Sequence, residues 1–121
     1  MIILIQAVMI IALELGLQSW IWVAGVPLAF GMAAPVSPLK ASGRGFAAGG
    51  LAWLLASLTL YCTSGRIIAG RMAAMLGFGP GRGWLMVLLT GFLGALVAGL
   101  AAFAGASIRA AVQRRVPKKE K

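Results

Sequence analysis

The stretch GFLGALVAGLAAFAGA, residues 91–106, decides the fold, because small residues recur in it at helical spacing. Side chains four positions apart share one face of a helix. One face carries Gly94, Ala98, Ala102 and Ala106, and the adjoining face carries Gly91, Ala95 and Gly99. Small side chains let two helix backbones approach closely in lipid. We therefore expect this helix to have two helical neighbours.

A second series of small residues lies in the preceding apolar segment, where Ala48, Ala52 and Ala56 recur at every fourth position. Three helices of this size bury only part of such faces among themselves, so we expect contact with another chain as well. In the alternative interpretation, Ala and Gly are simply common in this chain, which has 17 glycines, and the spacing has no packing role.

The composition is that of a membrane protein. Hydrophobic residues make up 61% and charged residues 11% of the 121 residues, against roughly 45–50% and about 25% in globular domains. Uncharged runs cover residues 15–39, 45–65 and 83–108, and each is about as long as the ~20 residues that a helix needs to cross a membrane. The sequence predicts an all-α polytopic membrane protein with one domain, residues 1–108, and three transmembrane helices at about 2–24, 46–64 and 83–107.

The first apolar block, residues 1–34, is too long for a single straight span. As one helix it would measure about 50 Å at about 1.5 Å per residue. Gly25 and Pro27 predict a break, because proline removes a backbone donor and clashes with the preceding turn. We expect a span over residues 2–24 and a kinked continuation; a hairpin of two short segments is the alternative. Residues 34–45, APVSPLKASGRG, read as a polar connection.

The net charge of +9 comes largely from the C-terminal tail, residues 109–121. Cytoplasmic segments of membrane proteins carry excess Lys and Arg. If the C-terminus is cytoplasmic, that side has eight basic residues: Lys40, Arg44, Arg109, Arg114, Arg115, Lys118, Lys119 and Lys121. The other side has three: Arg66, Arg71 and Arg82. The count predicts a multi-pass protein of the cell (inner) membrane with a basic cytoplasmic tail.

Several basic residues are candidates for contact with anionic lipid head groups or with a partner protein. They are Arg66, Arg71, Arg114, Arg115, Lys118 and Lys119. The first two belong to RIIAGRMAAML, residues 66–76, which is typical of an interfacial helix. No aromatic residue alternates with the charges of the tail, so we expect no nucleic-acid partner.

The sequence lacks the residues of the common catalytic sites. It contains no histidine, and its only acidic residues are Glu14 and Glu120, so no carboxylate pair is available for a metal or for acid–base catalysis. The single cysteine, Cys62, rules out a disulfide within the chain. The glycines at 77, 79, 81 and 83 indicate a turn. We expect no enzymatic activity, metal or cofactor.

Glu14 is the one charged residue inside the first apolar block. Twelve Leu, Ile or Val residues between Ile2 and Val23 contribute about −0.3 to −0.6 kcal/mol each to insertion, against up to about +3 kcal/mol for one charge. Gln6, Glu14 and Gln18 are spaced by eight and four, so they predict one polar stripe on this helix. An intramembrane polar stripe usually faces a protein interior or an aqueous cavity.

Three interpretations of Glu14 stay open. Its carboxyl group hydrogen-bonds to a neighbouring helix or pairs with an arginine of a partner, carries a proton or cation across the membrane, or lies near the membrane surface without a special role. The sequence as a whole favours a non-catalytic small accessory or structural subunit of a larger membrane complex, with other membrane protein subunits as partners. A homo-oligomeric ion- or proton-coupled transporter or channel using Glu14 is the alternative, and a lipid-binding, membrane-shaping protein is the third.

Overall fold

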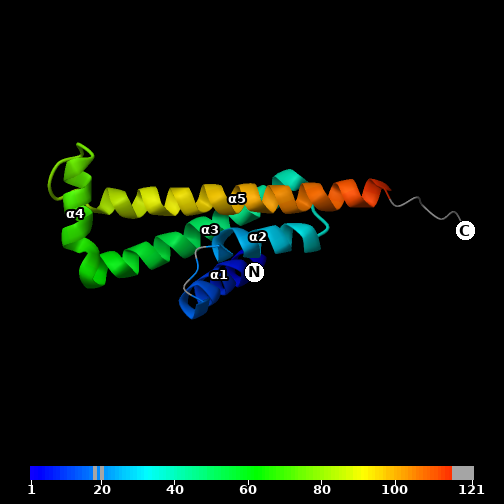
Figure 1. The fold of residues 1–121 in the computed structure, drawn as a ribbon, viewed down its shortest axis with the longest axis horizontal. Coiled ribbons are helices and arrows are strands. Elements are labelled where there is room, and N and C mark those ends of the chain that lie inside the picture. The colour runs from blue at the N-terminus through cyan, green and yellow to red at the C-terminus, as the bar shows by residue number, and fades with distance from the viewer. Residues whose placement is uncertain (18, 20, 116–121) are drawn as a thin grey trace, which may run out of the picture.

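The computed structural model describes residues 1–17, 19 and 21–115, and it is helical throughout, with no strand in this part of the chain. The predicted all-α fold is therefore confirmed. The elements in chain order are α1 (Ile2–Leu17), α2 (Trp22–Ala33), α3 (Pro38–Leu60), the π-helical segment η1 (Tyr61–Gly65), α4 (Arg66–Met75) and α5 (Trp84–Arg115) (Figure 1).

Two helical segments are long and apolar enough to cross a membrane. They are Pro38–Met75, which joins α3, η1 and α4, and Trp84–Arg115, which is α5. The 23 residues of α3 measure about 34 Å and the 32 residues of α5 about 48 Å at about 1.5 Å per residue. The apolar helices α1 and α2, with 16 and 12 residues, are shorter than such a segment.

The first predicted helix, residues 2–24, is wrong in its bounds. α1 ends at Leu17, α2 begins at Trp22, and α2 runs back beside α1 (Figure 1), so the alternative of two short segments describes this block. Pro27 lies inside α2 with its side chain fully buried. An interior proline removes one helical hydrogen bond, and here the packing around it holds the helix together.

The predicted connection at 34–45 is shorter than expected, because α3 already begins at Pro38. Ser37 is the N-cap residue, with extended backbone angles, and Pro38 occupies the first turn. Proline is favoured there because its missing N–H would have no helical partner and its φ is already helical. The connection between α2 and α3 is reduced to residues 34–37, which places the basic residues Lys40 and Arg44 on a helix.

α5 forms the axis of the fold. It packs against α3 over most of the length of α3 and against α2 along its C-terminal half, while α1 lies against α3 and α2 (Figure 1). At the far end the chain bends at η1, so that α4 lies across the ends of α3 and α5 (Figure 1). Local π-helical geometry is a recognised cause of such bends.

Small residues are inside this fold and large apolar residues are outside. The buried set includes Ala41, Ala48, Ala52, Ala95, Ala98, Ala102 and Ala106. Exposed large side chains include Leu55, Leu58, Leu60, Leu88, Phe92, Leu93, Leu100 and Phe103. In water-soluble proteins Leu, Ile and Phe are among the residues most often buried. The distribution in this chain is that of helices packed through small residues, with their bulky side chains turned outward.

The link between α4 and α5 is a glycine-rich turn, as its sequence indicates. Gly77, Gly79 and Gly81 have φ values of +82°, +87° and +87°, a left-handed conformation that residues with a Cβ rarely adopt. Gly83 then lets α5 begin close to α4, because a Cβ there would lie 2.9 Å from the Gly70 nitrogen.

Candidate functional site

The contact between α3 and α5 uses the small residues singled out in the sequence. A Cβ added at Gly45 would lie 2.6 Å from both the Ala102 Cβ and the Ala98 carbonyl oxygen. One added at Gly49 would lie 2.8 Å from the Gly94 carbonyl oxygen. Contacts this short leave no room for a side chain, so glycine at these positions sets the separation of the two helices.

α2 occupies a second face of α5. A Cβ at Gly31 would meet the Ala102 carbonyl oxygen and would lie 3.1 Å from the Ala106 nitrogen, and a Cβ at Gly105 would meet the Leu28 carbonyl oxygen. The structure therefore places Ala48, Ala52, Gly94, Ala98, Ala102 and Ala106 inside the chain, all of them buried. α3 contacts both series of small residues on α5, and α2 shares Ala102 and Ala106, so these faces no longer argue for a further chain.

Ala56 has a different environment from the other members of its series. It lines a groove of about 370 Å³ between α1 and α3. The residues around this groove are Ile11, Glu14, Leu15, Leu55, Ala56, Thr59 and Leu60. The groove places Glu14 beside the last two turns of α3.

The predicted polar stripe divides between two cavities. Gln6 and Glu14 both lie on α1, eight residues or about 12 Å apart along the axis, but only Glu14 lines the groove. Gln6 lines a separate pocket of about 310 Å³ near the other end of α1. Gln18 lies outside the described residues. The two polar groups of α1 therefore have different surroundings and are not part of a common site.

Glu14 has no charged partner in its groove. Glu14 as a residue is partly buried, and the lining contains no Lys or Arg. Thr59 is the other residue of this lining with a polar side chain, but its hydroxyl donates a 2.8 Å hydrogen bond to the Leu55 carbonyl of its own helix. The groove thus combines apolar walls with an acidic group that the lining does not neutralise.

Gln6 is the one buried polar residue of the described core, with 4% of its surface exposed. Its side-chain Oε1 has no hydrogen-bond partner. Arg44, from the first part of α3, is the charged residue of the same pocket. The sequence pattern predicts Arg44 in a polar connection on the basic side of the protein and gives it no site role. The Ser37–Pro38 pair, a typical helix start, is the signal that could have placed it on a helix.

Arg109 fixes one wall of the Gln6 pocket. Its Nη1 donates a hydrogen bond to the carbonyl oxygen of Ala34, which follows the last residue of α2 and lines the pocket. With its amide oxygen turned toward Arg109, Gln113 accepts from Nε and Nη2 of the same guanidinium at 3.3 Å. The guanidinium therefore links α5 to the C-terminal end of α2.

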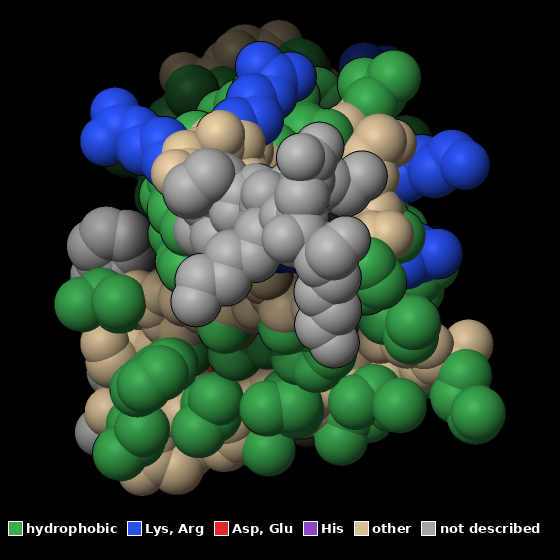
Figure 2. All heavy atoms as spheres, turned by 90° about the vertical axis from the view of Figure 1, so that its right-hand side faces the viewer, with side chains coloured by type: hydrophobic (Ala, Val, Ile, Leu, Met, Phe, Trp, Pro, Cys, Tyr) green, Lys and Arg blue, Asp and Glu red, His purple; other side chains and the backbone are tan. Residues whose placement is uncertain are grey.

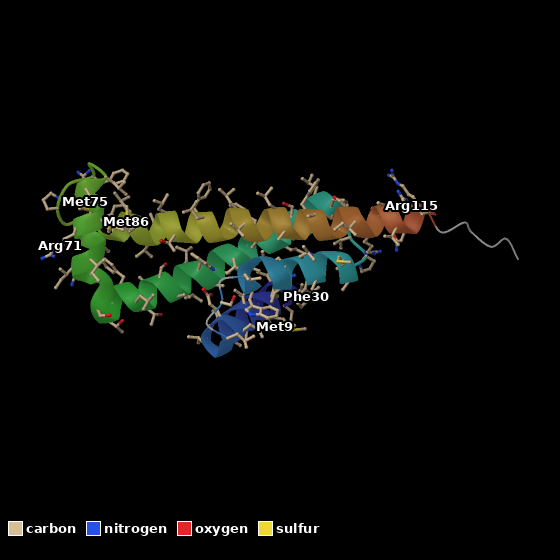
Figure 3. All side chains as sticks on the ribbon, in the orientation of Figure 1. Met9, Phe30, Arg71, Met75, Met86 and Arg115 are labelled. Atoms are coloured by element: carbon tan, nitrogen blue, oxygen red, sulfur yellow. The ribbon has the colours of Figure 1, made fainter. Side chains whose placement is uncertain are left out.

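The other basic residues lie at the two ends of the molecule. Arg71 is on α4 at one end and Arg115 is on α5 at the other (Figure 3). Figure 2 shows Lys and Arg side chains on several sides of the C-terminal end. Arg66, Arg71, Arg114 and Arg115 are all exposed, whereas Lys118 and Lys119 lie outside the described residues. The exposed arginines are thus available to partners at both ends.

Outside these two cavities, the described part of the chain has an exposed free thiol at Cys62 and a buried Trp53 Nε1 without a hydrogen-bond partner. No group of three His, Cys, Asp or Glu residues there could hold a metal. The hydroxyls of Ser57, Thr63 and Thr90 each donate to a carbonyl one helical turn earlier, which satisfies them within their own helices. The Glu14 groove and the Gln6 pocket are the candidate sites, because each combines a cavity with a polar side chain that has no partner in it.

Comparison with known proteins adds no assignment, because no family model, no curated protein and no solved structure matches this chain.

Proposed function

We propose that this chain is a non-catalytic integral membrane protein that serves as a small accessory subunit, and that it binds another membrane protein at the Glu14 groove. α3 and α5 cross the membrane, and the α1–α2 hairpin is a third embedded segment that enters and leaves on one side. The observation that carries the proposal is Glu14 itself, an acidic group in an apolar groove whose lining has no basic residue.

The outward-facing apolar side chains support the membrane location. Leu88, Leu93, Leu100 and Phe103 are exposed along α5, and alanine and glycine fill the contacts behind them. Water-soluble monomers rarely expose apolar patches larger than a few hundred Å². Along a transmembrane helix the same side chains face lipid and need no cover from protein.

The distribution of charge supports a location in the cell (inner) membrane with the C-terminus on the cytoplasmic side. Lys40, Arg44 and Arg109 lie at the end of the molecule where the α1–α2 hairpin begins and ends, together with Arg114 and Arg115 in the last turn of α5. The positive-inside rule assigns the side richer in Lys and Arg to the cytoplasm. α4 then lies at the opposite interface, where Arg66 and Arg71 reach anionic head groups.

Glu14 sets the chemistry of the partner. A charge held in a membrane is expensive unless it is paired, and removing its counter-charge from a buried pair typically costs about 3–5 kcal/mol. A helix of a second membrane protein that presents Arg, Lys or a hydroxyl group to the groove would neutralise or hydrogen-bond the carboxylate. The apolar lining, with Ile11, Leu15 and Leu55, would pack against the same helix.

Purification of the tagged chain from its native membrane in mild detergent tests the proposal. We expect a different membrane polypeptide in a fixed ratio, identified by mass spectrometry. Glu14→Gln keeps the size and the hydrogen-bonding capacity but removes the charge, so recovery of an ion-paired partner should fall about tenfold. Glu120→Gln, which removes the other acidic group of the chain, is the matched control and should recover the partner normally.

A homo-oligomeric transporter or channel is the second candidate, because the groove contains both a carboxylate and the Thr59 oxygen, which could bind a proton or cation. In that case the purified chain associates only with copies of itself. Glu14→Gln then keeps the oligomer but abolishes proton-coupled ion flux into vesicles. Finding this pair of results would replace the subunit proposal.

A further inference from the structure

The Gln6 pocket contains an unsatisfied hydrogen-bonding group. Gln6 is 4% exposed, its Oε1 has no partner, and it lines the pocket rather than the close-packed contact between α3 and α5. Leaving a buried polar atom without a hydrogen bond is unfavourable, because the atom has lost its bonds to water and gained none in the protein. A polar ligand that enters this pocket and donates a hydrogen bond to Oε1 would remove that cost.

The pocket also presents a positive charge. Arg44 lines it from α3, and the lining contains no acidic residue to neutralise the guanidinium. Arg109 lies at the adjoining wall, where it holds the Ala34 carbonyl, and Lys40 is exposed one helical turn before Arg44. The favoured ligand is therefore an anion, and the planar guanidinium of Arg44 is well suited to two oxygens of a phosphate.

The remaining walls are apolar and indicate where the ligand comes from. Ile2, Phe30 and Val36 line the pocket, and the large apolar side chains Leu4 and Met32 are exposed on α1 and α2. A free phosphate ion would gain nothing from these surfaces. A phospholipid would place its acyl chains along them and its head group at Arg44.

We propose that this pocket binds one anionic phospholipid with a hydroxyl-bearing head group, such as phosphatidylglycerol. The phosphate accepts hydrogen bonds from Arg44, and a head-group hydroxyl donates to Gln6 Oε1. Arg109 is a positioning residue, because it holds the Ala34 wall. This inference rests on the membrane location proposed above but not on a partner at Glu14.

Native mass spectrometry of the full chain, released from detergent in the presence of defined lipids, tests the assignment. Phosphatidylglycerol, phosphatidic acid and phosphatidylcholine are compared at equal concentration. We expect phosphatidylglycerol to be retained at least tenfold better than phosphatidylcholine. Retention of phosphatidylglycerol should also exceed that of phosphatidic acid, which carries the phosphate but not the alcohol hydroxyls of the glycerol head group. General electrostatic attraction alone would favour phosphatidic acid.

Two variants separate the contributions of the polar groups. Arg44→Ala should lower retention of both anionic lipids about tenfold, while Arg82→Ala, the same loss of charge at the opposite end, should not. Gln6→Leu keeps the approximate size and should remove the preference for phosphatidylglycerol over phosphatidic acid. Circular dichroism checks that each variant is folded. If Arg44→Ala does not fold, Arg44→Lys is the conservative replacement, and we expect it to retain part of the anionic lipid.

Three results would overturn the assignment. They are equal losses for Arg44→Ala and Arg82→Ala, equal retention of anionic and zwitterionic lipids, and saturation of the site by inorganic phosphate alone, which would make it a site for a free anion. A chain that stays monodisperse in water without detergent would instead refute the membrane location, and with it both proposals. Selective lipid binding without a co-purified partner would leave this assignment standing and refute only the subunit function.

Discussion

The α3–α5 pair and the helix α1 are built in different ways. Along α3 and α5, Gly45, Gly49, Gly94 and Ala98 bring two backbones together with no space for added atoms. α1 packs on the same α3 but leaves cavities of about 310 and 370 Å³ near its two ends, one at Gln6 and one at Glu14. The close-packed pair is a scaffold, and the looser helix brings Gln6 and Glu14 to the two cavities that a ligand or partner would enter.

The largest effect should come from filling the close-packed contact. Gly49→Ala places a Cβ 2.8 Å from the Gly94 carbonyl oxygen and in conflict with Ala98, and we expect it to destabilise the fold by roughly 2–3 kcal/mol, as overpacking does. Gly43→Ala, on the same helix but with nothing within 4 Å of the new Cβ, should instead stabilise by about 0.5–1 kcal/mol through helix propensity.

Denaturant titration in detergent, followed by tryptophan fluorescence, measures both variants of α3. Opposite signs for the two substitutions are the expected result. If Gly49→Ala stabilised the protein as much as Gly43→Ala, α3 and α5 would not be in close contact at Gly49. The contrast between a close-packed α3–α5 pair and a loosely packed α1 would then be wrong.

A smaller effect is expected where the hairpin is attached to the scaffold. Arg109→Met removes the donor to the Ala34 carbonyl while keeping an apolar stem, and we expect a loss of about 1–2 kcal/mol. Hydrogen exchange should rise in α2 and not in α3. Arg114→Met, which changes an exposed arginine of the same helix, should leave both rates unaltered. Equal exchange in the two variants would show that Arg109 does not hold the hairpin.

The scaffold was more predictable from the sequence than the hairpin. Recurring small residues at 91–106 predict a helix with two neighbours, and α5 has two, α3 along both series and α2 at Ala102 and Ala106. The uncharged apolar runs also predict the two long helices, because the length and composition of a segment can be read directly from the sequence. The spacing of these small residues does not predict that both neighbours belong to the same chain, because spacing identifies the face of a helix and not the segment that covers it.

The hairpin was the alternative and not the main prediction, because a local rule was outweighed by packing. Pro27 indicated a break, yet it lies buried inside α2, and the chain turns earlier, between Leu17 and Trp22. The spacing of Gln6 and Glu14 was interpreted as one stripe, whereas α2 and α3 divide it into two sites. Arg44 and Gln6 line the same pocket because α3 packs beside α1. The spacing of residues along α1 carries no information about this packing.

The smallest effect should come from the turn that lets α5 return along α3. Gly79→Ala forces a residue with a Cβ into a backbone with φ of +87°, although nothing lies within 4 Å of the new atom, so conformational strain alone should cost about 1 kcal/mol. Gly70→Ala, a helical glycine that also has open space around it, is the control and should be neutral or slightly stabilising in the same denaturant titration. A loss for Gly79→Ala as large as that for Gly49→Ala would mean that the turn, and not the glycine contacts, determines how α3 and α5 pair.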